Sequence, residues 1–218
     1  MAVQIAEAAL PVDVATQKDN VEIEVAPISG SSTPREGNFI IQSPYTEHPH
    51  LLDLEILDQE NSLLAQALTV LRSTRDDYAT APYNDSFNWD EVMGELKRLV
   101  SESGKGFKET SFYVVAFRSQ IKPSTDYSHL GDLDKDAHAE AVASGGFLKY
   151  WFGNPDSELR NLATCLWRSR EDAIAGGRGP AHRKAAGSTR ALYAYWKIDQ
   201  HRLTVRDDAE SWEITRWE

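Results

Sequence analysis

Histidine, tyrosine and arginine side chains in the second half of this 218-residue chain have the types and spacing to do acid–base chemistry. His182 follows the glycine-rich stretch 176–179, and an imidazole titrates in the range that proton transfer near neutral pH requires. Tyr113 and Arg118 lie within and at the end of an apolar run, where a hydroxyl and a guanidinium could polarise a carbonyl group. We therefore predict His182, Tyr113 and Arg118 as catalytic residues. The alternative for His182 is a helix residue that faces solvent.

A second group of residues, aromatic except for one arginine, falls on or beside the predicted strands. Apolar walls with a few polar groups are how small-molecule sites are built. The alternative is that these are large core residues, whose hydroxyl and indole N–H groups then need partners. The predicted substrate-binding residues are Tyr150, Trp151, Trp167, Arg168 and Trp196.

Metal and cofactor motifs are incomplete in this sequence. His138-Ala139-Glu140 matches the first half of the zinc-deaminase motif, but the second half needs two cysteines and the chain has only Cys165. No H-E-x-x-H sequence occurs, and His48-Pro49-His50 reads as a loop rather than a ligand pair. We predict no metal and no cofactor.

Phosphate binding and nucleophilic catalysis each have one weak candidate. The glycines at 176–179 precede a helix start, where free backbone N–H groups favour phosphate, yet both G-x-x-x-x-G-K-[ST] and G-x-G-x-x-G are missing. A helix break restarted by Pro180 is the simpler interpretation. Cys165 is interpreted as a small buried residue, and Ser169 as a helix N-cap.

Charge and hydropathy exclude several classes of protein. The net charge is −11, and the basic residues of the back half are interleaved with acids, so we predict no nucleic-acid binding. No apolar run approaches the ~20 residues of a membrane span, and Glu7 and Asp13 interrupt any secretory signal. A single cysteine excludes an internal disulfide. We predict a cytoplasmic protein without membrane contact.

The chain divides into a tail and one domain. Residues 1–36 carry prolines and little apolar periodicity, which predicts a flexible tail. Within it, Val21–Val25 alternates apolar and acidic residues and fits either an edge strand or a disordered arm. Residues 37–218 form the predicted domain, with an N-terminal helical part at 58–104 and a second part at 109–218.

Periodicity and capping residues place the elements of that domain. Asn88 with Glu91 resembles a capping box before the second helix. The apolar run 112–117 has no polar alternation, so both faces of its strand are expected to be covered. Helices are predicted at 58–75, 89–103 and 132–144, with a broken helical segment after Ser169; strands are predicted at 38–42, 109–118, 147–152, 162–167, 197–206 and 211–217.

From residue 109 the order is strand, helix, strand, strand, helix, strand, which is the ferredoxin-like order. We therefore predict an α+β fold in which helices cover one face of an antiparallel sheet. The other face needs a cover too, either from the two N-terminal helices or from a second subunit in a dimeric α+β barrel. A homodimer is thus one possible assembly.

Several sequence blocks resemble a family of uncharacterised fungal proteins, over about residue 38 to the end. The blocks are FNWDEV at 87–92, FYVVAFRS at 112–119, YWFG at 150–153, RNLATCLWRS at 160–169 and GPAH at 179–182. More loosely, the chain is similar to dimeric α+β barrel proteins such as the cofactor-free antibiotic-biosynthesis monooxygenases. In that likeness Trp167-Arg168-Ser169 ends a strand and His182 lies on the following helix, although the glycine-rich break before His182 departs from the pattern.

The predicted function combines these observations. We expect a cofactor-independent biosynthetic enzyme that acts on a hydrophobic small molecule. A cyclase or isomerase, including one for a pericyclic ring closure, fits the absence of every cofactor motif. A cofactor-free monooxygenase is the first alternative. The second is a non-catalytic small-molecule-binding or assembly protein that uses the same residues.

Overall fold

A five-stranded antiparallel sheet organises the computed structural model, which describes residues 38–218. Its strand order is β4-β5-β3-β6-β7. The strands are β3 (Thr110–Ile121), β4 (Phe147–Phe152), β5 (Arg160–Trp167), β6 (Tyr193–Val205) and β7 (Trp212–Arg216). The first four have the chain order and the neighbours of a ferredoxin-like sheet. The predicted α+β ferredoxin-like fold is confirmed.

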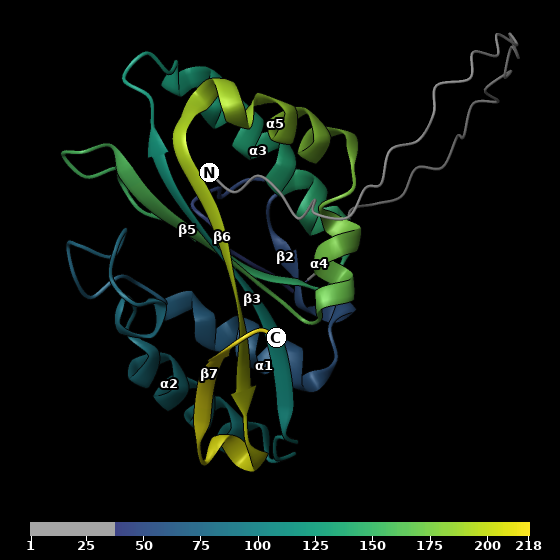
Figure 1. Ribbon diagram of the computed structural model, residues 1–218. Coiled ribbons are helices and arrows are strands. Elements are labelled where there is room, and N and C mark those ends of the chain that lie inside the picture. Colours follow the sequence, from purple (N-terminus) through teal and green to yellow (C-terminus); the bar gives the residue numbers. More distant parts are fainter. Residues whose placement is uncertain (1–37) are drawn as a thin grey trace, which may run out of the picture.

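Three helices cover one face of the sheet and two cover the other (Figure 1). On the first face lie α3 (Tyr127–Ser144), α4 (Arg170–Gly176) and α5 (Pro180–Leu192); on the second lie α1 (Gln59–Ala67) and α2 (Trp89–Ser103). A short pair of strands, β1 (Phe39–Ile40) and β2 (Leu52–Asp53), precedes α1. The second face could have been covered by the two N-terminal helices or by a second subunit. The N-terminal helices of the same chain cover it.

Alternate residues of β3 contribute to two separate cores, as the pleat of a strand requires. Those that pack with α1 and α2 are Phe112, Val114 and Ala116. Those that pack under α3 and α4 are Tyr113, Val115 and Phe117. Because both faces are buried, the strand has no polar alternation. Burying a side chain of this size stabilises the fold by about 1.5–3 kcal/mol.

The predicted capping box at the start of α2 is wrong. The Asn88 side chain accepts no hydrogen bond from a backbone N–H of the first turn. Its Oδ1 instead accepts from the backbone N–H of Arg72 at 2.8 Å, and its Nδ2 donates to the carbonyl of Val70 at 3.0 Å and to Glu91 at 2.9 Å. The amide therefore ties the preceding loop to the helix start.

Other element boundaries shift for local reasons. The predicted helix 58–75 ends as α-helix at Ala67 and continues as a 3₁₀ turn to Val70. The third helix begins five residues earlier than predicted because the Asp126 side chain caps it, accepting from the N–H groups of Ser128 and His129. Ser169 does cap α4, accepting from the N–H of Asp172 at 3.1 Å.

No helix within residues 38–218 is both long and apolar enough to cross a membrane. The alternating segment Val21–Val25 and the rest of the predicted tail lie outside the described residues.

Candidate functional site

A small cavity lies between the sheet and the helices α3 and α5. Its volume is about 20 Å³, which is room for about one water molecule. Five of the lining residues are aliphatic or aromatic: Phe117, Ala137, Ala141, Phe147 and Trp167. The others can donate, accept or transfer a proton: Asp134, His138, Tyr150, Cys165 and His182.

Helix α3 supplies one wall of this cavity. Asp134, Ala137, His138 and Ala141 follow one another at helical spacing, which places them on a single face. Asp134 is 3% exposed and His138 is 5% exposed. An aspartate this deeply buried needs hydrogen-bond partners, because an isolated charge in the interior is costly.

Two tyrosine hydroxyls satisfy the Asp134 carboxylate. Tyr45 donates to Oδ2 at 2.6 Å and Tyr150 donates to Oδ1 at 2.7 Å. Burial, reinforced by the nearby carboxylate of Asp134, raises the pKa of both Tyr45 and Tyr150. Both hydroxyls therefore keep their protons near neutral pH and act as donors to Asp134.

Two imidazoles meet beside this carboxylate. Nδ1 of His50 and Nδ1 of His138 lie 2.9 Å apart, so one ring donates and the other accepts. Burial, with a smaller contribution from His50, lowers the pKa of His138 to about 3. Burial also lowers the pKa of His50. Both rings are therefore neutral near pH 7.

The far nitrogen of His138 has no partner among residues 38–218. Its Nε2 is fully buried and makes no hydrogen bond, and the same is true of Nε1 of Trp167. Buried polar atoms are nearly always paired, so each such atom needs an explanation. Both belong to residues that line the cavity, where the oxygen of a bound molecule could pair with them.

His182 is held by a carboxylate from α3. Nδ1 of His182 lies 2.8 Å from Oε2 of Glu140, and the backbone N–H groups of Ala181 and His182 donate to the same carboxylate at 3.1 and 3.0 Å. Burial opposes ionisation of Glu140, but the hydrogen bonds from His182 and Ala181 outweigh it and lower the pKa of Glu140. Glu140 thus caps α5 and orients the imidazole at once.

Glycine at position 179 makes this contact possible. A Cβ on Gly179 would overlap the Glu140 carboxylate. Likewise a Cβ on Gly176 would overlap the indole ring of Trp167. The glycine-rich stretch therefore lets two site residues approach the backbone, and it breaks the helix as the simpler interpretation expected.

The thiol in the cavity is not activated. Cys165 is a buried residue of β5, and burial raises the pKa of its thiol. A nucleophilic cysteine needs the opposite shift. This fits its interpretation as a packing residue.

Three predicted site residues line the cavity: His182, Tyr150 and Trp167. Tyr113 lies elsewhere along the sheet, and its hydroxyl donates to Gln200 at 2.7 Å. Trp196 is half-buried on β6, and its Nε1 has no partner among the described residues. Neither residue lines the cavity.

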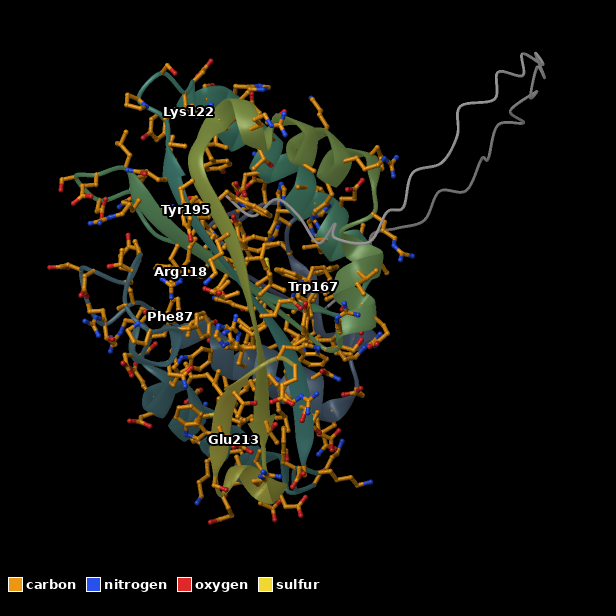
Figure 2. The ribbon with its side chains drawn as sticks, in the orientation of Figure 1. Phe87, Arg118, Lys122, Trp167, Tyr195 and Glu213 are labelled. Carbon is orange, nitrogen blue, oxygen red and sulfur yellow. The ribbon has the colours of Figure 1, made fainter. Side chains whose placement is uncertain are left out.

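Arg118 and Trp151 lie on the opposite face of the sheet. Arg118 donates to the carbonyls of Tyr78, Ala79 and Ala81, and its Nε donates to Asp199 at 3.2 Å. Figure 2 shows Arg118 and Trp167 on either side of the β6 ribbon. The predicted trio of His182, Tyr113 and Arg118 is thus not assembled at one site.

The remaining two predicted binding residues have structural partners. Trp151 packs edge-on against the rings of Tyr78 and Phe87, at centroid distances of 5.3 and 4.9 Å. Arg168 makes two hydrogen bonds to the Asp172 carboxylate, at 2.9 and 2.8 Å. Neither lines the cavity.

Sequence reasoning missed Asp134, Glu140 and the His50–His138 pair. Asp134 and His138 are four residues apart on α3, on the buried face that also carries Ala137 and Ala141. That spacing was the available signal. Glu140 and His138 were considered only as part of a zinc motif, and no group of three or more His, Cys, Asp or Glu residues within 38–218 could hold a metal ion.

Comparison with known proteins decides the family. Residues 41–216 match the model of the PB2B2.08-like family. The chain belongs to the PB2B2.08-like family. A relative in the fission yeast Schizosaccharomyces pombe, the UPF0643 protein PB2B2.08, is 37% identical over 191 residues, which cover 84% of this chain and 87% of the relative. The resemblance to an uncharacterised fungal family is confirmed.

Solved structures similar to this one include small oxygenase-like proteins. SnoaB of Streptomyces nogalater, a cofactor-independent oxygenase, is 12% identical with a TM-score of 0.36, and the match covers 41% of this chain and 89% of SnoaB. A putative antibiotic biosynthesis monooxygenase of Chloroflexus aurantiacus is 21% identical with a TM-score of 0.34, covering 42% of this chain and 89% of that one. These likenesses assign no chemistry to members of the PB2B2.08-like family.

Proposed function

We propose that this protein is a cofactor-independent enzyme that transfers protons within a hydrophobic small molecule bound at the α3–α5 cavity. One observation carries the proposal: a carboxylate-oriented imidazole, His182, faces the same apolar cavity as the neutral imidazole of His138. An oriented imidazole beside a neutral hydrogen-bond donor in an apolar cavity is an arrangement suited to acid–base chemistry.

His182 is the base in this proposal. With its Nδ1–H donated to Glu140, the ring presents the lone pair of Nε2, and Glu140 stabilises the imidazolium that forms on proton uptake. A proton next to a carbonyl group in the substrate is the chemistry that such a base serves. The carbanion left behind is an enolate, whose negative charge resides largely on oxygen.

His138 would stabilise that oxygen. In the tautomer in which His50 donates to Nδ1 of His138, the unpaired Nε2 of His138 carries a proton and can donate it as a hydrogen bond. The indole N–H of Trp167 is a second unpaired donor. Donors fixed in a water-poor cavity stabilise a developing oxyanion more strongly than water does.

The reaction class follows from the enolate. Reprotonation at another carbon gives an isomerase, and attack on an internal electrophile gives a cyclase; neither requires a cofactor. The alternative is a cofactor-free monooxygenase, in which the same carbanion reacts with dioxygen. All three begin with proton removal by His182.

Access to the cavity requires a movement. Ligand sites usually measure about 300–1,000 Å³, far above the present 20 Å³. The segment 43–50 lies against Asp134 and His138, two of the residues that line the cavity. It is fixed to α3 by the Tyr45–Asp134 and His50–His138 hydrogen bonds and by a Glu47–Lys135 ion pair of 2.5 Å. We name residues 43–50 the strap, and opening it would enlarge the cavity.

The cavity's small volume also favours a second candidate function, a non-catalytic assembly protein. In that case Phe147 and Trp167, whose ring centroids lie 5.5 Å apart, simply fill their own core. The buried polar groups would then serve only the specificity of packing.

Native mass spectrometry of the full chain purified from its host tests the proposal. We expect a bound molecule of a few hundred daltons on the wild type. Ala141→Phe, which fills the cavity, is expected to lose it, whereas the matched control Ala143→Phe on the exposed side of α3 keeps it. A wild type without any bound molecule, together with an Ala141→Phe variant that is more stable than the wild type, would favour the assembly protein.

A further inference from the structure

A row of polar residues crosses the sheet on the face that carries the cavity. Asn161 of β5 pairs with Ser119 of β3, and Ser119 pairs with Trp196 of β6. Asn161 and Ser119 are buried. Both point toward the helices α3 and α4, because Trp167 and Phe117, an even number of positions away on the same strands, pack there. Trp196 packs against the same core.

Tyr193 extends this row by one step along β6. It pairs with Ile121 of β3 and is buried. The hydroxyl of Tyr193 and Nε1 of Trp196 are fully buried, and neither makes a hydrogen bond within residues 38–218. A buried donor without a partner is costly, so two of them in one part of the core need an explanation. We name Asn161, Ser119, Trp196 and Tyr193 the polar end.

The polar end and the cavity lie in the same layer of the molecule. Phe117 lines the cavity. Ser119 and Ile121 follow it on the same face of β3, at roughly 7 and 13 Å along the strand. Trp196 packs against the core that contains the cavity and also against the core that contains Tyr193. An extended molecule in the cavity would therefore reach the polar end without crossing the sheet.

Two groups of the polar end are hydrogen-bond donors near neutral pH. Burial raises the pKa of Tyr193, and the carboxylate of Asp134 adds to the shift, so the hydroxyl keeps its proton. Asp134 lines the cavity, which places the Tyr193 hydroxyl within electrostatic reach of the site. The indole N–H of Trp196 can only donate. Two such donors in an apolar layer suit an oxygen atom that accepts hydrogen bonds.

We propose that the polar end binds a second oxygen of the substrate, through hydrogen bonds donated by Tyr193 and Trp196. This assignment rests on the proposed function, and it narrows the substrate to extended apolar molecules with an accepting oxygen at each end. The near oxygen lies at His138, where the proposed proton transfer takes place. The far oxygen fixes the direction of the molecule along β3, so that the same carbon always faces His182.

Binding at the polar end requires α5 to move away from the sheet. The helix contributes Ala185, Ala186 and, at its last residue, Leu192 to the core that contains Tyr193. The two alanines are small, so separating them from the sheet exposes less apolar surface than larger side chains would. Opening of the strap admits the reacting end of the substrate, and the movement of α5 admits its far end.

Two ketone probes test the proposal by titration calorimetry on the full chain. Acetylnaphthalene has one carbonyl group, and diacetylnaphthalene has one at each end of the fused rings. We expect the diketone to bind the wild type roughly tenfold more tightly, as one further buried hydrogen bond would give. The double variant Tyr193→Phe with Trp196→Phe is expected to bind both ketones equally.

Tyr195→Phe is the matched control for the double variant. Tyr195 is 51% exposed and pairs with Gln120, so it lies on the other face of the sheet from Ser119 (Figure 2). This variant is expected to keep the tenfold preference. Equal binding of the two ketones to the wild type, or a preference that survives in the double variant, would overturn the role of the polar end and leave the proposed function standing.

Thermal unfolding without any ketone supplies a readout that does not depend on ligand binding. Because the Tyr193 hydroxyl has no partner within residues 38–218, Tyr193→Phe is expected to keep or raise the melting temperature. A lower melting temperature would show that the hydroxyl is already paired, for example by a buried water, and would overturn this inference alone. Binding of neither ketone, with no molecule on the purified wild type, would contradict the proposed function and this inference together.

Discussion

Glu140 and His182 join α3 to α5 through a hydrogen bond of 2.8 Å between Oε2 and Nδ1. The same carboxylate accepts from two backbone N–H groups at the first turn of α5. One side chain therefore fixes both the position of a helix and the orientation of an imidazole. An imidazole fixed in this way presents its second nitrogen in a defined direction, which a proton-transfer site requires.

Gly179→Ala is expected to disrupt this contact. The added Cβ would overlap the Glu140 carboxylate, so Glu140 must move away from the first turn of α5. We expect a loss of about 0.5–2 kcal/mol in the free energy of unfolding, the size of a lost helix cap, measured by urea denaturation.

Gly187→Ala is the matched control in the same helix. A Cβ there meets nothing within 4 Å, and alanine favours the helix, so this variant is expected to gain about 0.5–1 kcal/mol. Equal effects from the two substitutions would contradict the capping role of Glu140.

The free energy of unfolding is expected to decrease as the pH is lowered, because of His138. Its pKa is about 3 in the folded state and about 6.5 in an unfolded chain. Between these values the unfolded state binds more protons, so the free energy of unfolding rises with pH. The contribution is complete above pH ~6.5 and is lost as pH falls toward 3, by up to about 1.4 kcal/mol per pH unit.

His138→Gln isolates this contribution. We expect the variant to be less stable at pH 7 by about 1–3 kcal/mol, because His50 loses its partner. Its stability should also depend less steeply on pH between about 6.5 and 3, measured by urea denaturation at a series of pH values. Parallel pH profiles for the variant and the wild type would show that the pKa of His138 is the same in the folded and unfolded states, and would contradict the lowered pKa.

Tyr150→Phe is expected to destabilise the protein by about 1–3 kcal/mol. It removes a buried donor, 2.7 Å from Oδ1 of Asp134, and leaves a buried carboxylate with one hydrogen bond fewer. Tyr127→Phe, at an exposed position on the same helix as Asp134, serves as the control and is expected to change stability by less than about 0.5 kcal/mol. Thermal unfolding measures both.

Cys165 is a natural reporter for strap opening, since it lines the cavity and is the chain's single cysteine. We expect slow reaction of its thiol with an aromatic disulfide reagent in the wild type. Tyr45→Phe combined with Glu47→Gln removes two attachments of the strap and is expected to speed the reaction roughly tenfold.

The exposed substitution Glu55→Gln, outside the strap, provides the comparison for this reaction. A rate for the strap variant that matches both Glu55→Gln and the wild type would show that the strap does not control access to the cavity.

Much of the fold could be predicted from periodicity and element order. The β3 strand, α2 and the ferredoxin-like order follow from local patterns that the structure confirms. The site was harder, because it depends on packing between segments far apart in sequence. His182 could be selected for its chemistry, but its partner Glu140 lies forty-two residues away on another helix.

Strand parity explains why the predicted catalytic trio does not assemble. Tyr113 and Arg118 lie an odd number of positions apart on β3, and side chains alternate between faces along a strand. They therefore point to opposite sides of the sheet. Arg118 binds three loop carbonyls there instead. This outcome could have been read from the sequence once the strand was assigned.

The cover that α1 and α2 provide for one face of the sheet has a thermodynamic consequence. Where two subunits close a sheet, dilution promotes unfolding, because the folded state then depends on mass action. Here the apolar side chains of Phe112, Val114 and Leu203 are buried within a single chain. The integrity of this core is therefore set by intramolecular contacts, and we expect its melting temperature to be the same at micromolar and at millimolar protein.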